Sequence, residues 1–295
     1  MTARLAGCGT ALVTPFSRDG AIDERALRGL VDWQIAEGVH FLVPCGSTGE
    51  AATMSAEEQC HVIEIVVDAA KGRVPIVAGA ASNDTKLAIA LSKAAKSAGA
   101  THLLHTSPMY NKPPQRGIIA HYRAITDAVD LPIVAYNVPA RTGSNVEAKT
   151  TLALAATRGI VGIKEASGNL AQITDILRER PPEFSVLSGD DEMTLPVMAA
   201  GGDGIISVVS NATPRLMSEL CDCMRRSDLA GARERHFRLL PWMRAAFLES
   251  NPLPVKAALG MMRKIENMLR LPLVPMDDKH SGALRSALVA AGVAL

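Results

Sequence analysis

One lysine carries the most distinctive chemical possibility in this sequence. Lys164 follows a short apolar run at residues 160–163 and precedes a polar turn at 165–168. An apolar run of this length, bounded by glycine, is typical of a buried strand. Taken alone, the stretch favours a lysine just past the strand with its amine in solvent, because lysine is rarely fully buried. The chemistry of Lys164 therefore depends on whether the fold encloses it.

An enclosed lysine acquires a reactivity that an exposed one lacks. Desolvation disfavours the ammonium form and lowers the pKa of a lysine from about 10.4 towards the range of about 7–8 that is useful in catalysis. Without that shift, only about one lysine in two thousand is neutral at pH 7. A neutral amine attacks a ketone to give an imine, which acts as an electron sink for carbon–carbon chemistry. We therefore interpret Lys164 as a candidate imine-forming residue.

Other polar groups follow other apolar runs. Tyr110, Tyr136 and Thr48 offer hydroxyls that donate and accept hydrogen bonds, as a proton relay requires. The turn Gly-Ser-Thr-Gly at 46–49 has backbone N–H groups that could hold a carboxylate. Arg141 could bind a second carboxylate in a two-pronged geometry that lysine cannot supply. Singly, each has a structural explanation: a tyrosine at a strand end often belongs to the core, and Arg141 could pair with a surface carboxylate.

Eight apolar runs alternate with helical stretches over about the first 225 residues. The runs lie at residues 8–13, 39–44, 75–79, 101–106, 132–136, 160–164, 184–188 and 204–209. Apolar strands without alternation indicate a parallel sheet that is covered on both faces. Eight such units, with the typical barrel length of about 250 residues, predict an α/β fold with a (β/α)8 TIM barrel. A doubly wound open sheet is the competitor, but no GxGxxG motif follows the first run.

The barrel gives the scattered polar residues a common location. In this fold the active site lies at the carboxyl ends of the strands. We therefore expect one mouth to gather Thr10, Thr14, the loop 46–50, Tyr110, Tyr136, Arg141, Lys164, Gly189 and Ser207.

The remaining sequence predicts helices only. Residues 226–295 contain helical patterns at 228–248, 254–268 and 279–293, and Pro241 is expected to kink or split the first of them. We interpret this region as a C-terminal helical appendage to a catalytic barrel domain at residues 1–225. It could equally serve a contact between subunits.

Composition narrows the class of protein. The chain has 295 residues, of which 48% are hydrophobic, and its net charge is +1. The sequence contains no basic patch, so we expect neither nucleic acid nor a membrane surface as a partner. The N-terminus at residues 1–5 lacks the apolar core of a signal peptide, and we expect a cytoplasmic protein. The five cysteines are scattered and are expected to be structural thiols. No cluster with metal-ligand spacing appears, so a metal is not implied.

Three motifs resemble the pyruvate-dependent class I aldolase family, which includes N-acetylneuraminate lyase. They lie at residues 46–50, 136–142 and 162–168, and the resemblance continues in register from residue 7 to residue 254. Within the family, the sequence is most similar to members that condense pyruvate with L-aspartate-4-semialdehyde to give 4-hydroxy-tetrahydrodipicolinate, on the path to diaminopimelate and lysine. The resemblance implies that activity here.

The resemblance also implies roles for single residues. Lys164 would form a Schiff base with pyruvate, with no cofactor. Tyr136, Thr48 and Tyr110 would relay protons, with Tyr110 reaching in from a neighbouring subunit. The family usually forms a homotetramer built from two tight dimers.

Substrate binding is implied in the same way. Ser47 and Thr48 would hold the pyruvate carboxylate, and Arg141 the carboxylate of the semialdehyde. Gly189 and Ile206 would line the pocket through their main-chain carbonyls.

Two kinds of departure from the family pattern are present. Ser47 replaces a frequent threonine but keeps the hydroxyl, and Met109 replaces a second tyrosine. Ala56 and Leu87 stand where lysine-inhibited members carry a histidine and a glutamate, although Asn83 is retained. We therefore predict weak or absent feedback inhibition by lysine.

Two other functions remain open at this point. One is a sister aldolase, acting on N-acetylneuraminate or a 2-keto-3-deoxy sugar acid, in which hydroxyl-binding groups would suit the place of Arg141 better than a guanidinium. The other is a barrel that has lost catalysis and serves as a scaffold. The joint presence of Lys164, Tyr136, Thr48 and Tyr110 disfavours the scaffold.

Overall fold

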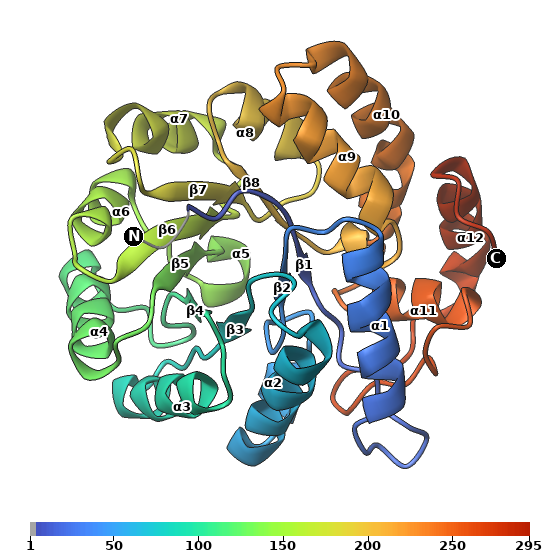
Figure 1. The fold of residues 1–295 in the computed structure, drawn as a ribbon, viewed down its shortest axis with the longest axis horizontal. Coiled ribbons are helices and arrows are strands. Elements are labelled where there is room, and N and C mark those ends of the chain that lie inside the picture. The colour runs from blue at the N-terminus through green and yellow to red at the C-terminus, as the bar shows by residue number, and fades with distance from the viewer. Residues whose placement is uncertain (1–3) are drawn as a thin grey trace.

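Eight parallel strands form the centre of the molecule, and helices surround them (Figure 1). The computed structural model describes residues 4–295. Residues 1–3 lie outside the described residues. They include the start of the predicted barrel domain and part of the N-terminus from which we predicted that the chain has no signal peptide. The strands are β1 Gly7–Ala11, β2 Phe41–Val43, β3 Val77–Gly79, β4 His102–Thr106, β5 Ile133–Asn137, β6 Ile160–Glu165, β7 Ser185–Ser188 and β8 Gly204–Ser207.

The strands close into a barrel. Their order in the sheet is β2-β1-β8-β7-β6-β5-β4-β3. A parallel bridge between Leu42 and Ile76 joins the two ends of this order, so the predicted (β/α)8 barrel is confirmed. Inside it, side chains such as Phe41, Val134 and Ile206 form an apolar cluster that fills the interior. The barrel interior is therefore a packed core, and only the rims of the barrel leave room for a reaction.

Local signals in the sequence account for where the surrounding helices begin. Asp23 caps α1, Ser55 and Glu58 form a complete capping box on α2, and Asn169 caps α7. The helices of the barrel are α1 Glu24–Ala36, α2 Ala56–Ala70, α3 Thr85–Ser97, α4 Gln115–Ala128, α5 Pro139–Thr142, α6 Ala148–Ala155, α7 Leu170–Glu179, α8 Thr194–Ala199 and α9 Pro214–Arg225. Single 3-10 turns occur at η1 Ala51–Thr53, η2 Val209–Asn211 and η3 Asp278–His280. The eighth apolar run therefore ends as η2 rather than as strand.

Three helices follow the barrel and differ from their predicted bounds. They are α10 Leu229–Ala245, α11 Leu253–Met261 and α12 Ser281–Ala290. Pro241 does not split α10, because it lies on the exposed face and the carbonyl that it leaves without a donor can meet water. α11 stops seven residues before the predicted end, and Arg263 just beyond it has a left-handed backbone with φ of 56°.

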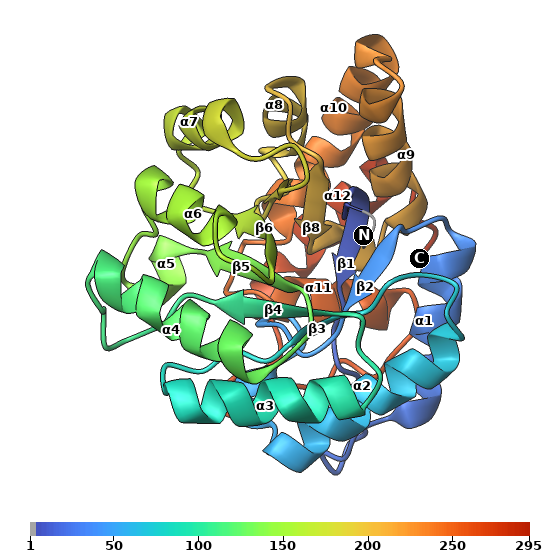
Figure 2. The ribbon, with the colours of Figure 1, turned by 60° about the vertical axis from the view of Figure 1, so that its left-hand side comes forward.

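The C-terminal helices pack on one side of the barrel, beside α1 and α9 (Figures 1 and 2). Trp242 of α10 is fully buried and donates its indole N–H to the Val209 carbonyl of η2 at 3.1 Å. α11 and α12 belong to the same apolar cluster as β1, β8 and α9 residues. The division into two domains at residue 225 remains a prediction. Among residues 4–295, no helix is both long enough and apolar enough to cross a membrane.

Candidate active site

Lys164 lies inside the barrel, near the carboxyl end of β6. It pairs in register with Tyr136 on β5 and with Leu187 on β7, and only 5% of it is exposed. The interpretation of Lys164 as an end-of-strand lysine with its amine in solvent is therefore wrong. The barrel encloses the side chain because alternate residues of β6 point inward, and Lys164 occupies one of those positions.

The amine of Lys164 faces an aromatic ring instead of a carboxylate. Its Nζ atom lies 4.3 Å from the centroid of the Tyr136 ring. Within residues 4–295, neither an ion pair nor a hydrogen bond is found for this amine. Burial lowers the pKa of Lys164, the charge of Asp191 opposes this shift and the charge of Arg141 assists it, and the resulting pKa is about 8. A substantial fraction of the amine is therefore neutral near pH 8.

Gly189, just after β7, makes room for the lysine. A Cβ atom built at this glycine would lie 2.9 Å from Lys164 Cε and 3.0 Å from its Cγ. Its backbone N–H donates to the carbonyl of Glu165 at 2.8 Å, which holds the two segments together. Any larger residue at position 189 would have to displace the Lys164 side chain. The structure therefore brings this predicted pocket residue directly against the candidate nucleophile.

Tyr136 is buried beside Lys164 and keeps its proton. Burial raises the pKa of the Tyr136 hydroxyl to about 12, and the nearby charge of Arg141 partly offsets that rise. A phenol in this state donates a hydrogen bond at neutral pH. Ile206, the other predicted pocket residue, is fully buried and shares the interior apolar cluster with Tyr136.

The loop at residues 46–50 follows β2 at the same end of the barrel. Thr48 is buried, and its Oγ1 accepts a hydrogen bond from Asn251 Nδ2 at 2.9 Å. Thr14, also predicted for the mouth, donates to the Gly49 carbonyl at 2.7 Å. Ser47 is exposed. The loop therefore presents one buried and one exposed hydroxyl.

Arg141 lies in the short helix α5, directly after β5. Its side chain is exposed, and Nη2 donates to the backbone carbonyl of Asn251 at 3.2 Å. Asn251 thus contacts both Thr48 and Arg141 from the C-terminal region. Asn251 was not among the predicted site residues, although it lies within residues 7–254, over which the chain resembles the family. Its partners are distant in sequence, so no local spacing signals the contact.

A second buried carboxylate that sequence reasoning missed lies near the mouth. Asp191 accepts hydrogen bonds from Ser207 Oγ at 2.5 Å and from the Val208 N–H at 3.1 Å. Burial raises the pKa of Asp191 to about 6, against the opposing effect of these hydrogen bonds. Ser207 is thereby occupied with Asp191. Thr10 is similarly committed to Gln34, to which it donates at 2.7 Å.

Tyr110 is an exposed residue that lies beside the short helix α5. Its residue is 86% exposed, its φ is 72°, and its backbone N–H donates to the Thr142 carbonyl at 3.1 Å. The expectation that the mouth gathers Tyr110 with the other residues stays a prediction. The exposed ring is available to a second subunit.

Glu165 follows Lys164 but points to the other side of the strand. Its buried carboxylate accepts hydrogen bonds from Asn137 Nδ2, Gln172 Nε2 and the Ser167 N–H at 3.0, 3.1 and 2.7 Å. These bonds join β5, β6 and α7 outside the barrel interior. The carboxylate of Glu165 is therefore committed to structural hydrogen bonds.

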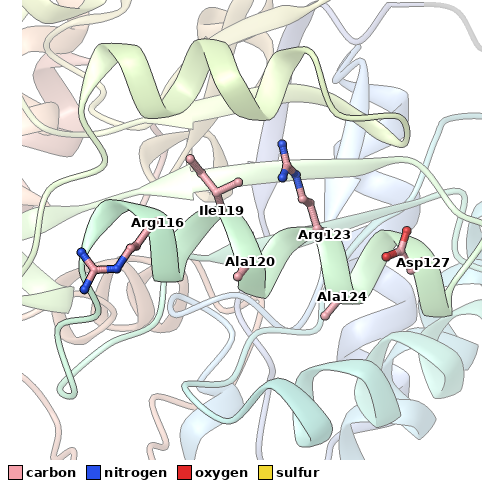
Figure 3. Close-up of a pocket in the computed structure, with 6 residues that line it drawn as sticks. All are labelled: Arg116, Ile119, Ala120, Arg123, Ala124 and Asp127. Carbon is pink, nitrogen blue, oxygen red and sulfur yellow. The ribbon is translucent and has the colours of Figure 1, made fainter.

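A hollow on the outside of the barrel lies apart from these groups (Figure 3). It is formed on the exposed side of α4, opposite the face that buries Ile118 and Tyr122. Its lining contains none of the predicted site residues; it consists of Arg116, Ile119, Ala120, Arg123, Ala124 and Asp127. In the part of the chain that the structure describes, no group of three or more His, Cys, Asp or Glu side chains is placed to hold a metal ion.

Comparisons with known proteins agree over nearly the whole chain. The dihydrodipicolinate synthetase family matches residues 4–291. The 4-hydroxy-tetrahydrodipicolinate synthase of Maridesulfovibrio salexigens is 51% identical over 288 residues, which cover 97% of this chain and 98% of that protein. The synthase of Koribacter versatilis is 50% identical over 291 residues, covering 98% and 97%.

Solved structures give the same result. The chloride-inhibited dihydrodipicolinate synthase of Acinetobacter baumannii, complexed with pyruvate, superposes with a TM-score of 0.96 at 42% identity and covers 98% of this chain and 99% of that chain. A monomeric dihydrodipicolinate synthase variant superposes with the same TM-score at 41% identity, covering 98% of each chain.

Proposed function

The chain belongs to the dihydrodipicolinate synthetase family, and we propose from this premise that it condenses pyruvate with L-aspartate-4-semialdehyde through an imine on Lys164. The product is 4-hydroxy-tetrahydrodipicolinate, in the biosynthesis of diaminopimelate and lysine. This activity is the one that the sequence predicted, and it is the activity named for relatives at about 50% identity. One observation of this chain carries the mechanism: a buried amine with a lowered pKa faces Tyr136 at the rim of the barrel.

The proposed chemistry begins with the neutral amine of Lys164. Its lone pair attacks the keto carbon of pyruvate, and loss of water gives an iminium ion. The positive nitrogen withdraws electrons, so the methyl group loses a proton and an enamine forms. The enamine carbon attacks the aldehyde carbon of the semialdehyde, whose oxygen takes up a proton. The amino group of that substrate then attacks the iminium carbon, which closes the ring and releases Lys164.

Three hydroxyls serve the proton transfers in this proposal. Tyr136 is the central donor, because its raised pKa keeps the phenol protonated beside Lys164. Thr48, held by Asn251, is the second member of the relay. Tyr110 completes it from a neighbouring subunit, a role supported by its exposure in the single chain.

The two substrate carboxylates are assigned to different groups. Ser47 and Thr48 hold the carboxylate of pyruvate through hydroxyl and backbone N–H groups. Arg141 holds the carboxylate of the semialdehyde with a guanidinium whose Nη2 is anchored on the Asn251 carbonyl. Gly189 and Ile206 line the pocket between them, with Gly189 against the Lys164 side chain.

We propose a cytoplasmic homotetramer built from two tight dimers as the working assembly. The exposed Tyr110 requires a partner if it is to act in the relay. The solved relatives include a monomeric variant with a TM-score of 0.96 to this chain, so the fold alone does not determine the assembly. Sedimentation of the wild type and of Tyr110→Phe would connect assembly with activity.

We also propose that lysine inhibits this enzyme weakly or not at all. The synthase of Cyanidioschyzon merolae, 37% identical in sequence, was solved with lysine bound. Here Ala56 and Leu87 replace the histidine and glutamate of lysine-inhibited members. An inhibition curve with lysine tests this proposal, and strong, saturable inhibition at sub-millimolar lysine would contradict it.

Borohydride trapping tests the main proposal. Wild-type protein and Lys164→Ala are each incubated with pyruvate and sodium borohydride, and their masses are compared. We expect an adduct on Lys164 in the wild type only, followed by turnover when aspartate semialdehyde is supplied. Absence of an adduct on the wild type would rule out the imine. An adduct without turnover of the semialdehyde would assign the imine to another aldehyde, such as a sugar-acid substrate.

A further inference from the structure

A second buried lysine lies outside the proposed chemistry. Lys256 of α11 is fully buried, and its amine forms an ion pair with Glu50. The same amine donates to the Met268 carbonyl at 2.7 Å and lies 4.3 Å from the centroid of the Phe16 ring. Both partners of the ion pair have side chains with 0% exposure. A buried charge requires such partners, so the pair is a fixed part of the fold.

Glu50 connects this pair to the active-site loop. It is the residue that directly follows Gly49, two positions from Thr48. Its other carboxylate oxygen accepts the Arg270 backbone N–H at 3.1 Å. Glu50 is therefore held by α11 and by the segment that follows α11. Both contacts are made by the C-terminal region.

The loop needs an external restraint because its backbone is unfavourable. Cys45 and Glu50, which flank residues 46–49, have φ angles of 57° and 56°, in the left-handed region that residues with a Cβ atom rarely adopt. Such conformations persist only where the surroundings impose them. Glu50 contributes its own restraint, since its side chain is the one that Lys256 and Arg270 hold.

The C-terminal region contacts this loop at two points. Asn251, just before α11, donates to Thr48 Oγ1 at 2.9 Å, and Lys256, within α11, pairs with Glu50. The two contacts lie two residues apart on the loop and five apart on the C-terminal segment. Together they restrict both translation and rotation of the loop relative to the barrel.

We propose that Glu50 and Lys256 are positioning residues, whose buried ion pair holds the loop 46–50 so that Thr48 and the neighbouring N–H groups meet the pyruvate carboxylate. The inference rests on the proposed function, because it assigns the pair an effect on pyruvate binding. Neither residue touches the substrate. Their loss should weaken the binding of pyruvate, so that the half-saturating pyruvate concentration rises. It should not act only by reducing the amount of folded protein.

The test measures borohydride trapping as a function of pyruvate concentration for the wild type and Glu50→Gln. Glutamine keeps the shape of the side chain and removes its charge. We expect the half-saturating pyruvate concentration to rise at least tenfold, together with a lower kcat in the full reaction, because Thr48 is displaced. Lys256 should carry no adduct in either protein, since its amine is enclosed by its partners.

A matched control separates positioning from stability. Arg180 and Asp203 form another ion pair with low exposure, 11% and 10%, but Asp203 precedes β8 at the opposite end of the barrel. Asp203→Asn is expected to lower the Tm while leaving the half-saturating pyruvate concentration within twofold of the wild type. A comparable rise in Asp203→Asn would overturn the proposal, since the effect would then follow from general destabilisation.

A double variant covers the case in which Glu50→Gln does not fold. Glu50→Gln/Lys256→Met removes both charges with little change in volume, a replacement that buried ion pairs often tolerate. We expect the double variant to fold and to require at least tenfold more pyruvate. A wild-type pyruvate dependence in a folded variant overturns the positioning role. Absence of trapping in the wild type would instead contradict the proposed function itself.

Discussion

Two buried lysines in this molecule have similar surroundings but different charge partners. Lys164 in the barrel mouth and Lys256 at the junction with the C-terminal helices each place Nζ 4.3 Å from the centroid of an aromatic ring. Burial lowers the pKa of each to about 8. The difference is the carboxylate: Glu50 pairs with Lys256, whereas no side chain within residues 4–295 forms an ion pair with Lys164.

This difference decides what each amine can do. The Lys256 amine pairs with a buried carboxylate and donates to the Met268 carbonyl, so its lone pair is not presented to a substrate. A lysine that faces a phenol ring and the space beside Gly189 keeps its lone pair available once it loses a proton. Desolvation alone does not make a catalytic lysine, because the absence of a fixed anionic partner is needed as well.

The largest expected effect comes from removing the catalytic amine. Lys164→Ala should lower kcat/KM by about a thousandfold or more and abolish the borohydride adduct, because no other group can form the imine. The measurement is steady-state kinetics with both substrates, with circular dichroism to confirm folding. Activity within about tenfold of the wild type would contradict the catalytic role that distinguishes Lys164 from Lys256.

Breaking the other lysine should affect stability first. Lys256→Met leaves the Glu50 carboxylate buried without its counter-ion and should lower the free energy of unfolding by about 3–5 kcal/mol. Chemical denaturation measures this change. Adding Glu50→Gln should recover most of the loss, because the unpaired charge is then gone. A double variant as unstable as Lys256→Met would mean that packing, not charge, dominates at this position.

Filling the space beside Lys164 should reduce catalysis. The Cβ atom of Gly189→Ala would lie 2.7 Å from the Ala166 Cβ and 2.9 Å from Lys164 Cε, so the loop after β6 or the amine must move by a few tenths of an ångström or more. We expect kcat/KM to fall by about 10- to 100-fold, since small errors in the position of a nucleophile are costly. The matched control is Gly282→Ala in α12, where no atom lies within 4 Å of the added Cβ. Equal losses in the two variants would contradict this explanation.

The smallest effect concerns pH. Because we propose the free amine of Lys164 as the nucleophile, we expect kcat/KM to rise with pH and to level off above about 8, the pKa of Lys164. Asp191→Asn removes a negative charge that raises this pKa and should move the rise to lower pH, by less than about one unit. Arg141→Gln removes a charge that lowers it and should move the rise to higher pH. Shifts in the same direction for both variants would contradict the proposed electrostatics.

Much of the fold could be predicted because its signals are local. Ser55 with Glu58, Asp23 and Asn169 mark helix starts through hydrogen bonds that span only two or three residues. Each apolar run overlaps one barrel strand, and counting the runs placed Lys164 on the sixth. The departures from prediction fell where the wider environment decides: Pro241 does not split α10, and α11 ends early at Met261.

The site was predictable only in part, for the same reason. From motifs and from the rule that strand ends converge, the sequence predicted Lys164, Tyr136, Thr48 and Arg141 as site residues, and their roles stay predictions. It could not reveal that Asn251 contacts Thr48, 203 residues away, or that the Tyr110 ring is exposed in the single chain. Contacts between distant segments depend on how helices pack against the barrel, which no short window of sequence records.

The sequence by itself determined the alternation of strands and helices, the helix caps and the family, because these follow from patterns within a few residues or over the whole chain. Tertiary structure alone decided which buried lysine has a carboxylate beside it. Lys164 and Lys256 look alike as residues, and both are withdrawn from water. Their pKa values are lowered by the same burial, but the partner that fixes one amine comes from a loop far away in the chain. Charge pairing is a property of distances in space, so it is settled only when the chain has folded.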